Sequence, residues 1–141
     1  MKKTLFILAI ICSTFVYGQK ETPVEVPKIA MKVPFGESIT INETTITFKK
    51  VLEDSRCPKE VNCIWAGRIK ILVEVSKDGT TAETKELIFG QTRPGESESK
   101  QIATLNGKTY VGMNVTPYPQ EEGISDPSKY ALLLVKKTNK E

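Results

Sequence analysis

The order of apolar and polar residues from position 29 onward predicts short β-strands separated by turns. The clearest case is the segment 68–75, where apolar residues alternate with mostly charged ones: Ile69, Ile71, Val73 and Val75 against Arg68, Lys70 and Glu74. Strict alternation is typical of a strand that buries one face. We therefore expect the first group to face a core and the second group to face solvent.

Further segments have the same alternation or are rich in β-branched and aromatic residues, and we expect strands at 29–33, 37–41, 44–52, 80–89, 102–105, 110–115 and 130–135. The first of these is expected at a sheet edge. The continuous apolar run 132–135 predicts a central strand, buried on both sides. The alternation slips at 50–52, which predicts a β-bulge.

Turn signals separate these segments. Asp78-Gly79 and Asn106-Gly107 are typical of two-residue hairpin turns. The segments 90–100 and 117–127 are rich in proline and charged residues and are expected to be long loops. No run of ten residues has a helical period with a cap. The predicted fold class is all-β: a single antiparallel β-sandwich of immunoglobulin-like architecture, or an open barrel, with seven or eight strands.

The N-terminal residues are typical of a secretory signal. Met1-Lys2-Lys3 is basic, and the segment 4–17 is almost continuously apolar. We expect residues 1–18 to be removed after Gly18, residues 19–34 to be an extended N-terminal segment, and residues 35–141 to form the β domain. A lipid anchor at Cys12 is the alternative, but Ile11 stands where that processing uses a small residue. The prediction is therefore export to the periplasm or the extracellular space.

Charge narrows the class of partner. Loss of Lys2 and Lys3 with the signal lowers the formal net charge from +3 to +1, because residues 1–18 contain no acidic residue. A nearly neutral mature chain gives no reason to expect a nucleic acid or an anionic membrane as partner. No later segment has the roughly 20 apolar residues of a transmembrane helix. The partner is expected in the envelope or outside the cell.

Composition also argues against an enzyme. The chain has no histidine, which removes the commonest general base, the Ser-His and Cys-His pairs, and imidazole metal sites. We expect no cofactor and no metal. The carboxylates lie in predicted loops or on strand surfaces, where solvation is their ordinary state. A Ca²⁺ site at Glu53 and Asp54 is the alternative, although no loop has the spacing of such a site.

Two cysteines remain in the mature chain, Cys57 and Cys63, and export favours a disulfide between them. Their spacing differs from that of dithiol oxidoreductases. The chain-entropy model gives about 2 kcal/mol for so small a ring, so the bond is expected to hold one loop rather than the whole fold.

We expect the residues around this ring to have structural roles. Asp54 is expected to begin a turn and to pair with Arg56, and Pro58 fixes φ. Trp65 is expected to pack over the disulfide, with Gly67 permitting a close backbone approach beside it.

A functional interpretation of the same loop makes Arg56 and Lys59 recognition residues. A disulfide-held loop with basic residues beside a proline is what an inhibitor of a trypsin-like protease would present, and the Arg56 guanidinium could equally bind a carboxylate of a partner. Burial of Arg56 against Asp54 would exclude both roles.

The loop also carries a sequence motif, DSRCPxxxxCxWAG, which spans residues 54–67. With the segment 117–119, Pro-Tyr-Pro, and a final strand at Tyr130, it resembles a family of small bacterial secreted proteins and lipoproteins. That family has no established activity, so the resemblance implies an envelope or extracellular location and no catalytic residue. Our leading interpretation is a non-enzymatic exported β-sandwich with a binding or structural role, and protease inhibition through the 56–59 loop is the alternative.

Overall fold

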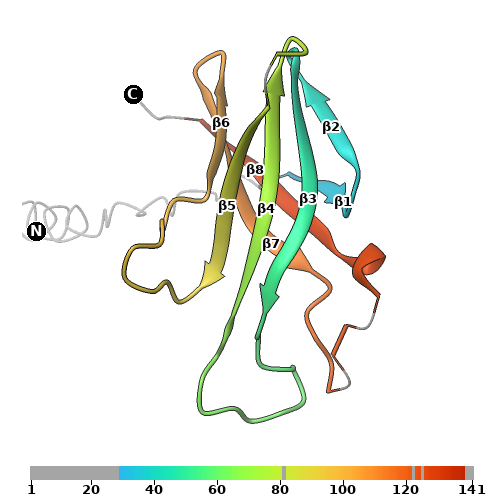
Figure 1. Cartoon of the computed structure of the whole chain (residues 1–141), viewed down its shortest axis with the longest axis vertical. Coiled ribbons are helices and arrows are strands. Elements are labelled where there is room, and N and C mark those ends of the chain that lie inside the picture. The colour runs from blue at the N-terminus through green and yellow to red at the C-terminus, as the bar shows by residue number, and fades with distance from the viewer. Residues whose placement is uncertain (1–28, 81, 122, 125, 139–141) are drawn as a thin grey trace, which may run out of the picture.

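The computed structural model describes residues 29–80, 82–121, 123–124 and 126–138, which form an antiparallel β-sandwich of two four-stranded sheets (Figure 1). One sheet has the order β1-β8-β7-β6 and the other β2-β3-β4-β5. The strands are β1 (Ala30–Pro34), β2 (Ser38–Ile41), β3 (Thr44–Asp54), β4 (Arg68–Lys77), β5 (Glu83–Gly90), β6 (Gln101–Leu105), β7 (Lys108–Thr116) and β8 (Ala131–Thr138). The predicted all-β sandwich is confirmed. The predicted signal peptide lies outside the described residues.

The core lies between the two sheets and is built from the alternation seen in the sequence. In β4, Ile69, Ile71 and Val73 have no exposed surface, as predicted for that strand. Each such side chain contributes about 1.5–3 kcal/mol when buried. The other fully buried large apolar side chains of the core are Val33, Ile46, Phe48, Leu87, Ile102, Val115, Leu132 and Leu134.

The first and last strands lie side by side in one sheet. β8 lies between β1 and β7, which confirms it as a central strand, and β1 is at the edge. Because β1 pairs with β8 from Ala30 to Pro34, these residues belong to the sandwich. The β domain therefore includes residues that the sequence analysis had placed in the extended N-terminal segment.

Two irregularities in β3 determine which way its last residues point. The register with β4 shifts between Phe48 and Lys50 and again between Val51 and Glu53, which confirms the predicted bulge. Beyond the second shift, Glu53 is opposite Lys70 and Asp54 is opposite Ile69. Residues opposite each other in a sheet share a face, so Asp54 points towards the core and Glu53 points outward.

The two ends of the sandwich differ. Tight turns lie at one end, including Asn106-Gly107, where φ is 49° and 71° as expected for a hairpin. Three longer connections lie at the other end: residues 55–67 between β3 and β4, 91–100 between β5 and β6, and 117–130 between β7 and β8, the last with a 3-10 turn at Pro127–Lys129 (Figure 1). We call this the loop end, and residues 55–67 the disulfide loop. No helix in the described part of the chain is long and apolar enough to cross a membrane.

Candidate functional site: the disulfide loop and its supports

Arg56, the second residue of the disulfide loop, is buried, with 7% of its surface exposed. Its Nε donates to Asp54 Oδ1 at 2.8 Å and its Nη2 donates to Asp54 Oδ2 at 2.7 Å, a bidentate ion pair. The bulged end of β3 makes this pair, because it turns the Asp54 carboxylate towards the interior. The predicted pairing of Arg56 with Asp54 is therefore present.

The same guanidinium connects the disulfide loop to the opposite sheet. Arg56 Nη1 donates to the Val115 carbonyl at 2.7 Å, and Nη2 donates to the Pro117 carbonyl at 3.0 Å. The guanidinium carbon lies 5.0 Å from the centre of the Tyr118 ring, a cation–π distance. Since β7 is in the sheet that does not contain β3, Arg56 holds the two sheets together at the loop end.

Tyr130, the residue before β8, is the last member of this group, and we call Asp54, Arg56, Tyr118 and Tyr130 the Arg56 cluster. Its hydroxyl donates to Asp54 Oδ2 at 2.8 Å. Burial alone would raise the pKa of Asp54, but the hydrogen bonds from Arg56 and Tyr130 outweigh it and leave that pKa below its ordinary value. Burial, together with the hydrogen bond to Asp54, raises the pKa of Tyr130 to about 12.

Burial of Arg56 corrects the functional interpretation of this residue. Each guanidinium nitrogen donates a hydrogen bond within the protein, so Arg56 has no face with which to enter a protease pocket or bind a partner's carboxylate. The protease-inhibitor alternative, which required an exposed Arg56, loses its main residue. Lys59 is exposed as expected, while its backbone N–H donates to the Pro119 carbonyl at 3.3 Å.

The predicted disulfide joins Cys57 and Cys63, whose Cα atoms are 5.9 Å apart. Two further backbone hydrogen bonds hold the loop: Cys57 N–H donates to the Ala66 carbonyl at 2.9 Å, and Val61 N–H donates to the Pro58 carbonyl at 3.2 Å. The loop is therefore closed by the disulfide, connected across its base, and attached to the 117–130 connection. Pro58, as expected, takes part in a turn inside the ring.

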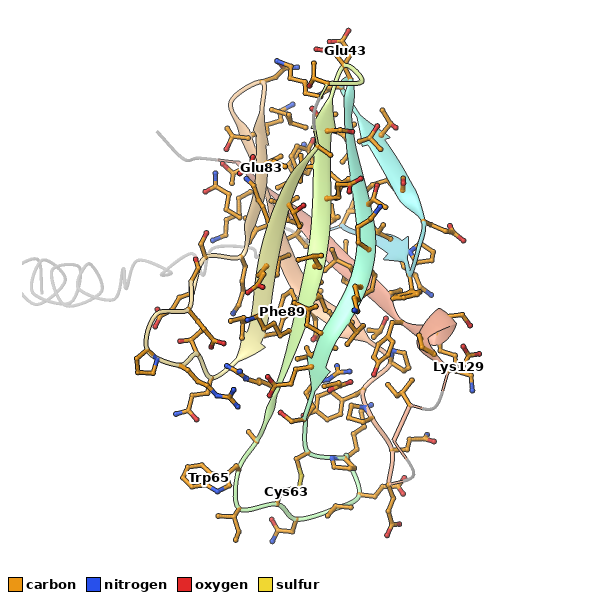
Figure 2. The ribbon with its side chains drawn as sticks, viewed as in Figure 1. Glu43, Cys63, Trp65, Glu83, Phe89 and Lys129 are labelled. Carbon is orange, nitrogen blue, oxygen red and sulfur yellow. A yellow bond between two sulfur atoms is a disulfide. The ribbon has the colours of Figure 1, made fainter. Side chains whose placement is uncertain are left out.

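Trp65 does not pack over the disulfide, which corrects the prediction for this residue. Its side chain projects from the loop into solvent and is 74% exposed (Figure 2). The prediction assumed that Cys63 and Trp65 lie on one side of a strand, but β4 begins only at Arg68 and residues 61–67 are irregular.

Trp65 is accompanied by other exposed apolar side chains. Ile64 is 93% exposed and Val61 is 40% exposed. We call Val61, Ile64 and Trp65 the apolar tip. Loops commonly expose polar residues, so three large apolar side chains within five positions are unusual.

Gly67 closes the neck of the loop, as its predicted role requires. Its φ is +70°, and a Cβ at this position would lie 1.8 Å from the Ser55 carbonyl oxygen. Ser55 N–H donates to the Arg68 carbonyl at 2.8 Å across the same neck. Glycine is therefore required both by the backbone conformation and by the space.

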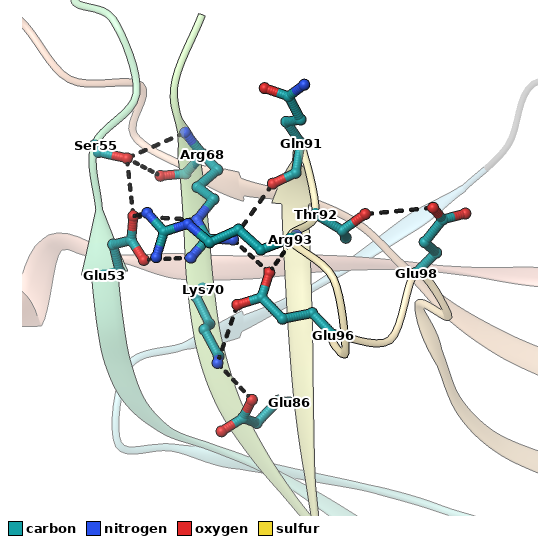
Figure 3. Close-up of polar contacts among 10 residues, drawn as sticks. All are labelled: Glu53, Ser55, Arg68, Lys70, Glu86, Gln91, Thr92, Arg93, Glu96 and Glu98. Atoms are coloured by element: carbon teal, nitrogen blue, oxygen red, sulfur yellow. Dashed lines mark hydrogen bonds and ion pairs between the residues drawn. The ribbon is translucent and has the colours of Figure 1, made fainter.

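A second buried arginine, Arg68, supports the other side of the loop end (Figure 3). Its Nη2 donates to Glu53 Oε2 at 2.8 Å, and its Nη1 pairs with Glu96 Oε2 at 2.5 Å. Lys70 pairs with Glu86 at 2.7 Å and with the other Glu96 oxygen at 3.5 Å. These contacts attach the 91–100 connection to the outer face of β4.

The roles of Arg68, Glu96 and Tyr130 were not predicted, and the first two were interpreted as solvated surface residues. Alternation correctly placed Arg68 on the outer face, but it carries no information about which loop covers that face. The hydrogen bonds from Arg68 and from the Arg93 N–H lower the pKa of Glu96 to about 2. The Arg68 hydrogen bonds likewise lower the pKa of Glu53.

Glu53 and Asp54 therefore do not form the Ca²⁺ site considered as an alternative, because they point to opposite faces and bind different arginines. Among the described residues, no group of three or more His, Cys, Asp and Glu side chains is placed to hold a metal ion. A shallow hollow of about 420 Å³ lies where the 91–100 connection enters β6, on the sheet opposite the disulfide loop's strands, and is lined by Ser99, Lys100, Gln101, Thr109, Val111 and Lys137. No family model matches the chain, and neither a curated protein nor a solved structure is significantly similar to it.

Proposed function

We propose that the protein is an exported, non-enzymatic domain that binds a partner in the cell envelope or outside the cell, and that the disulfide loop is its contact surface. One observation carries the proposal: Ile64 and Trp65 are 93% and 74% exposed on a loop whose backbone is fixed from several sides. Exposed apolar residues on a constrained loop are typical of interaction sites.

The cost of exposing these side chains supports the proposal. Burying a large apolar side chain stabilises a protein by about 1.5–3 kcal/mol. In the isolated molecule, the exposed side chains of the apolar tip gain little of this stabilisation. The Arg56 cluster, the disulfide and Gly67 all hold the loop, and none of them buries Trp65. The supports thus fix a loop that presents its apolar residues to solvent.

The lowered pKa values of the carboxyl groups at the loop end favour binding over catalysis. A general acid needs a carboxyl group whose pKa is raised towards the working pH. Here arginine hydrogen bonds hold the pKa values of Glu53 and Glu96 below their ordinary range, and the net effect at Asp54 is also a lowered pKa. These carboxylates act as fixed negative partners of arginine.

Export is supported by the disulfide, because such bonds persist in oxidising compartments. The basic and apolar residues 1–17 point the same way. Membership of the secreted family with the DSRCPxxxxCxWAG motif stays a prediction.

The test measures retention of purified residues 19–141 on envelope fractions from a bacterium that produces the protein. We expect the double variant Ile64→Ser/Trp65→Ser to lose most of the retained signal. The matched control is Met113→Ser, because Met113 is an exposed apolar residue, 47% accessible, on β7. Equal retention of the wild type and the double variant would exclude the disulfide loop as the contact surface.

A further inference from the structure

Resting on the proposed function, we infer that the partner is a folded protein with an apolar pocket that receives the Trp65 indole, with Ile64 packing at the mouth of that pocket. The Trp65 side chain projects from the loop end of the sandwich (Figure 2), and Ile64 and Val61 are exposed in the same loop. A group that projects in this way presents a convex apolar surface. A convex apolar group needs a concave apolar receptor if water is to be excluded from both surfaces.

The residues around the tip form a polar rim. Lys59, Glu60 and Asn62 are exposed in the same loop, interleaved with the apolar residues. An apolar anchor surrounded by polar residues is the usual anatomy of a protein–protein contact, in which tryptophan is the most enriched anchor. The rim has one positive and one negative residue, which fits a partner surface of mixed charge.

The loop is also held in place before it binds. The disulfide closes residues 57–63, the Lys59 N–H is bonded to Pro119, and Arg56 fixes the base to β7. A preorganised loop loses little conformational freedom on binding, so a few contacts can give useful affinity. An indole has only two side-chain torsions, which keeps its own ordering cost small.

Charge at the loop end argues against a bilayer as the partner. Peripheral membrane sites combine apolar side chains with several free lysines or arginines that attract anionic lipids. Here Arg56 and Arg68 are paired with carboxylates, and the exposed Arg93 lies 3.6 Å from Glu53. The exposed Lys59 and Lys129 are accompanied by the acidic Glu60, Glu121 and Asp126. Two or three apolar side chains without basic support give weak membrane binding.

A glycan is disfavoured by the neighbours of Trp65. Sugars stack on an aromatic ring and also need polar side chains beside it for their hydroxyl groups. The residues directly beside Trp65 in the sequence are apolar, Ile64 and Ala66, and the nearest residue of the polar rim, Asn62, is three positions away.

The experiment uses residues 19–141 with a photo-crosslinking amino acid in place of Ile64, which leaves Trp65 intact, and the same amino acid in place of Met113 as the matched control. The envelope fraction is tested untreated, after protease digestion, after lipid extraction, and after digestion of its peptidoglycan. We expect a discrete protein adduct from position 64 and none from position 113. Of the three treatments, only protease digestion should abolish this adduct.

Competition then tests the role of the indole. Excess unlabelled wild type should suppress the adduct, whereas Trp65→Ser should compete about 30-fold less well, the change expected for a binding hot spot. Binding that survives protease but is lost on lipid extraction, or recovered on vesicles of phosphatidylethanolamine and phosphatidylglycerol, would overturn the inference in favour of a bilayer. Loss on peptidoglycan digestion alone would overturn it in favour of a glycan.

These outcomes are distinct from failure of the proposed function. If binding depends on Ile64 and Trp65 but the receptor is lipid or glycan, the disulfide loop remains the contact surface and only the protein partner is excluded. If the Ile64→Ser/Trp65→Ser variant binds as the wild type does, both proposals fail.

Discussion

The Tyr130 hydroxyl donates a 2.8 Å hydrogen bond to Oδ2 of Asp54, 76 residues earlier in the chain. Asp54 ends β3 in one sheet, and Tyr130 precedes β8 in the other. The same carboxylate holds the Arg56 guanidinium, which reaches across to the Val115 carbonyl. The disulfide loop therefore begins at a group of hydrogen bonds that connects the two sheets. These hydrogen bonds fix the base of the loop where it leaves the sandwich.

Removing Arg56 should destabilise the protein far more than removing a surface cation. Arg56→Ala leaves the Asp54 carboxylate buried without its counter-charge, and breaking such a pair costs about 3–5 kcal/mol. Tyr130→Phe removes one hydrogen bond to a charged group, so we expect a loss of about 1.5–3 kcal/mol. Denaturant unfolding of both variants measures these changes.

The control for this prediction is Lys49→Ala. Lys49 pairs with Glu74 at 3.4 Å, but its side chain is 47% exposed, so the loss should be at most about 1 kcal/mol. Equal midpoints for Arg56→Ala and Lys49→Ala would contradict a structural role for the Arg56 cluster.

Acid should weaken the attachment of the 91–100 connection. The pKa of Glu96 is about 2 in the folded protein, because Arg68 and the Arg93 N–H bind its carboxylate, and its ordinary value is 4.5. A lowered pKa contributes stability above the unfolded-state value, and that contribution is lost as the pH falls from about 4.5 towards 2.

Glu96→Gln tests this pH dependence. The variant should be less stable than the wild type at pH 7. It should also lose less stability than the wild type between pH 5 and 2.5, because it lacks the carboxyl group whose pKa differs between the folded and unfolded states. Unfolding midpoints across this range measure the two slopes, and Glu98→Gln, in the same connection, is the control. Parallel slopes for wild type and Glu96→Gln would contradict the prediction.

The sandwich could be predicted from the sequence because a half-buried strand has alternating apolar and polar residues. The alternation at Ile69, Ile71 and Val73 reports one buried face, and Asn106-Gly107 reports a turn that needs positive φ at both residues. The slip near Lys50 reported a bulge. Each of these signals is local, so it can be read without knowing what lies opposite.

The candidate site was harder to predict because its contacts are long-range. Asp54 and Arg56 could be paired from their spacing, but Val115 and Tyr130 reach them only through the fold. Trp65 was misplaced for a related reason. A lone tryptophan beside a disulfide is expected to be buried, and only the structure shows that residues 61–67 form no strand and that Trp65 is exposed.

Trp65 should contribute almost nothing to stability. Because its side chain is 74% exposed, Trp65→Ser should change the free energy of unfolding by no more than about 0.5 kcal/mol, whereas Phe48→Ala, in the core, should cost about 3–5 kcal/mol. The indole is the only one in the chain, so its fluorescence should change little on unfolding and be readily quenched by iodide. A large spectral shift on unfolding would show that Trp65 is buried in solution.

Gly67→Ala should distort the disulfide loop, whereas Gly36→Ala should not. Both glycines have positive φ, +70° and +76°, so alanine pays a similar conformational cost of about 1–2 kcal/mol at each position. Only at Gly67 would the new Cβ meet backbone, lying 1.8 Å from the Ser55 carbonyl oxygen, while at Gly36 nothing lies within 4 Å. The neck between Ser55 and Arg68 must therefore open in Gly67→Ala, which adds to its loss of stability and releases the loop from its support.

Unfolding midpoints measure the loss of stability in Gly67→Ala and Gly36→Ala. Amide exchange at Cys57, whose N–H donates to the Ala66 carbonyl, measures the release of the loop. Equal destabilisation of the two variants, with unchanged exchange at Cys57, would mean that the neck tolerates a side chain and that the loop is not held in the way described.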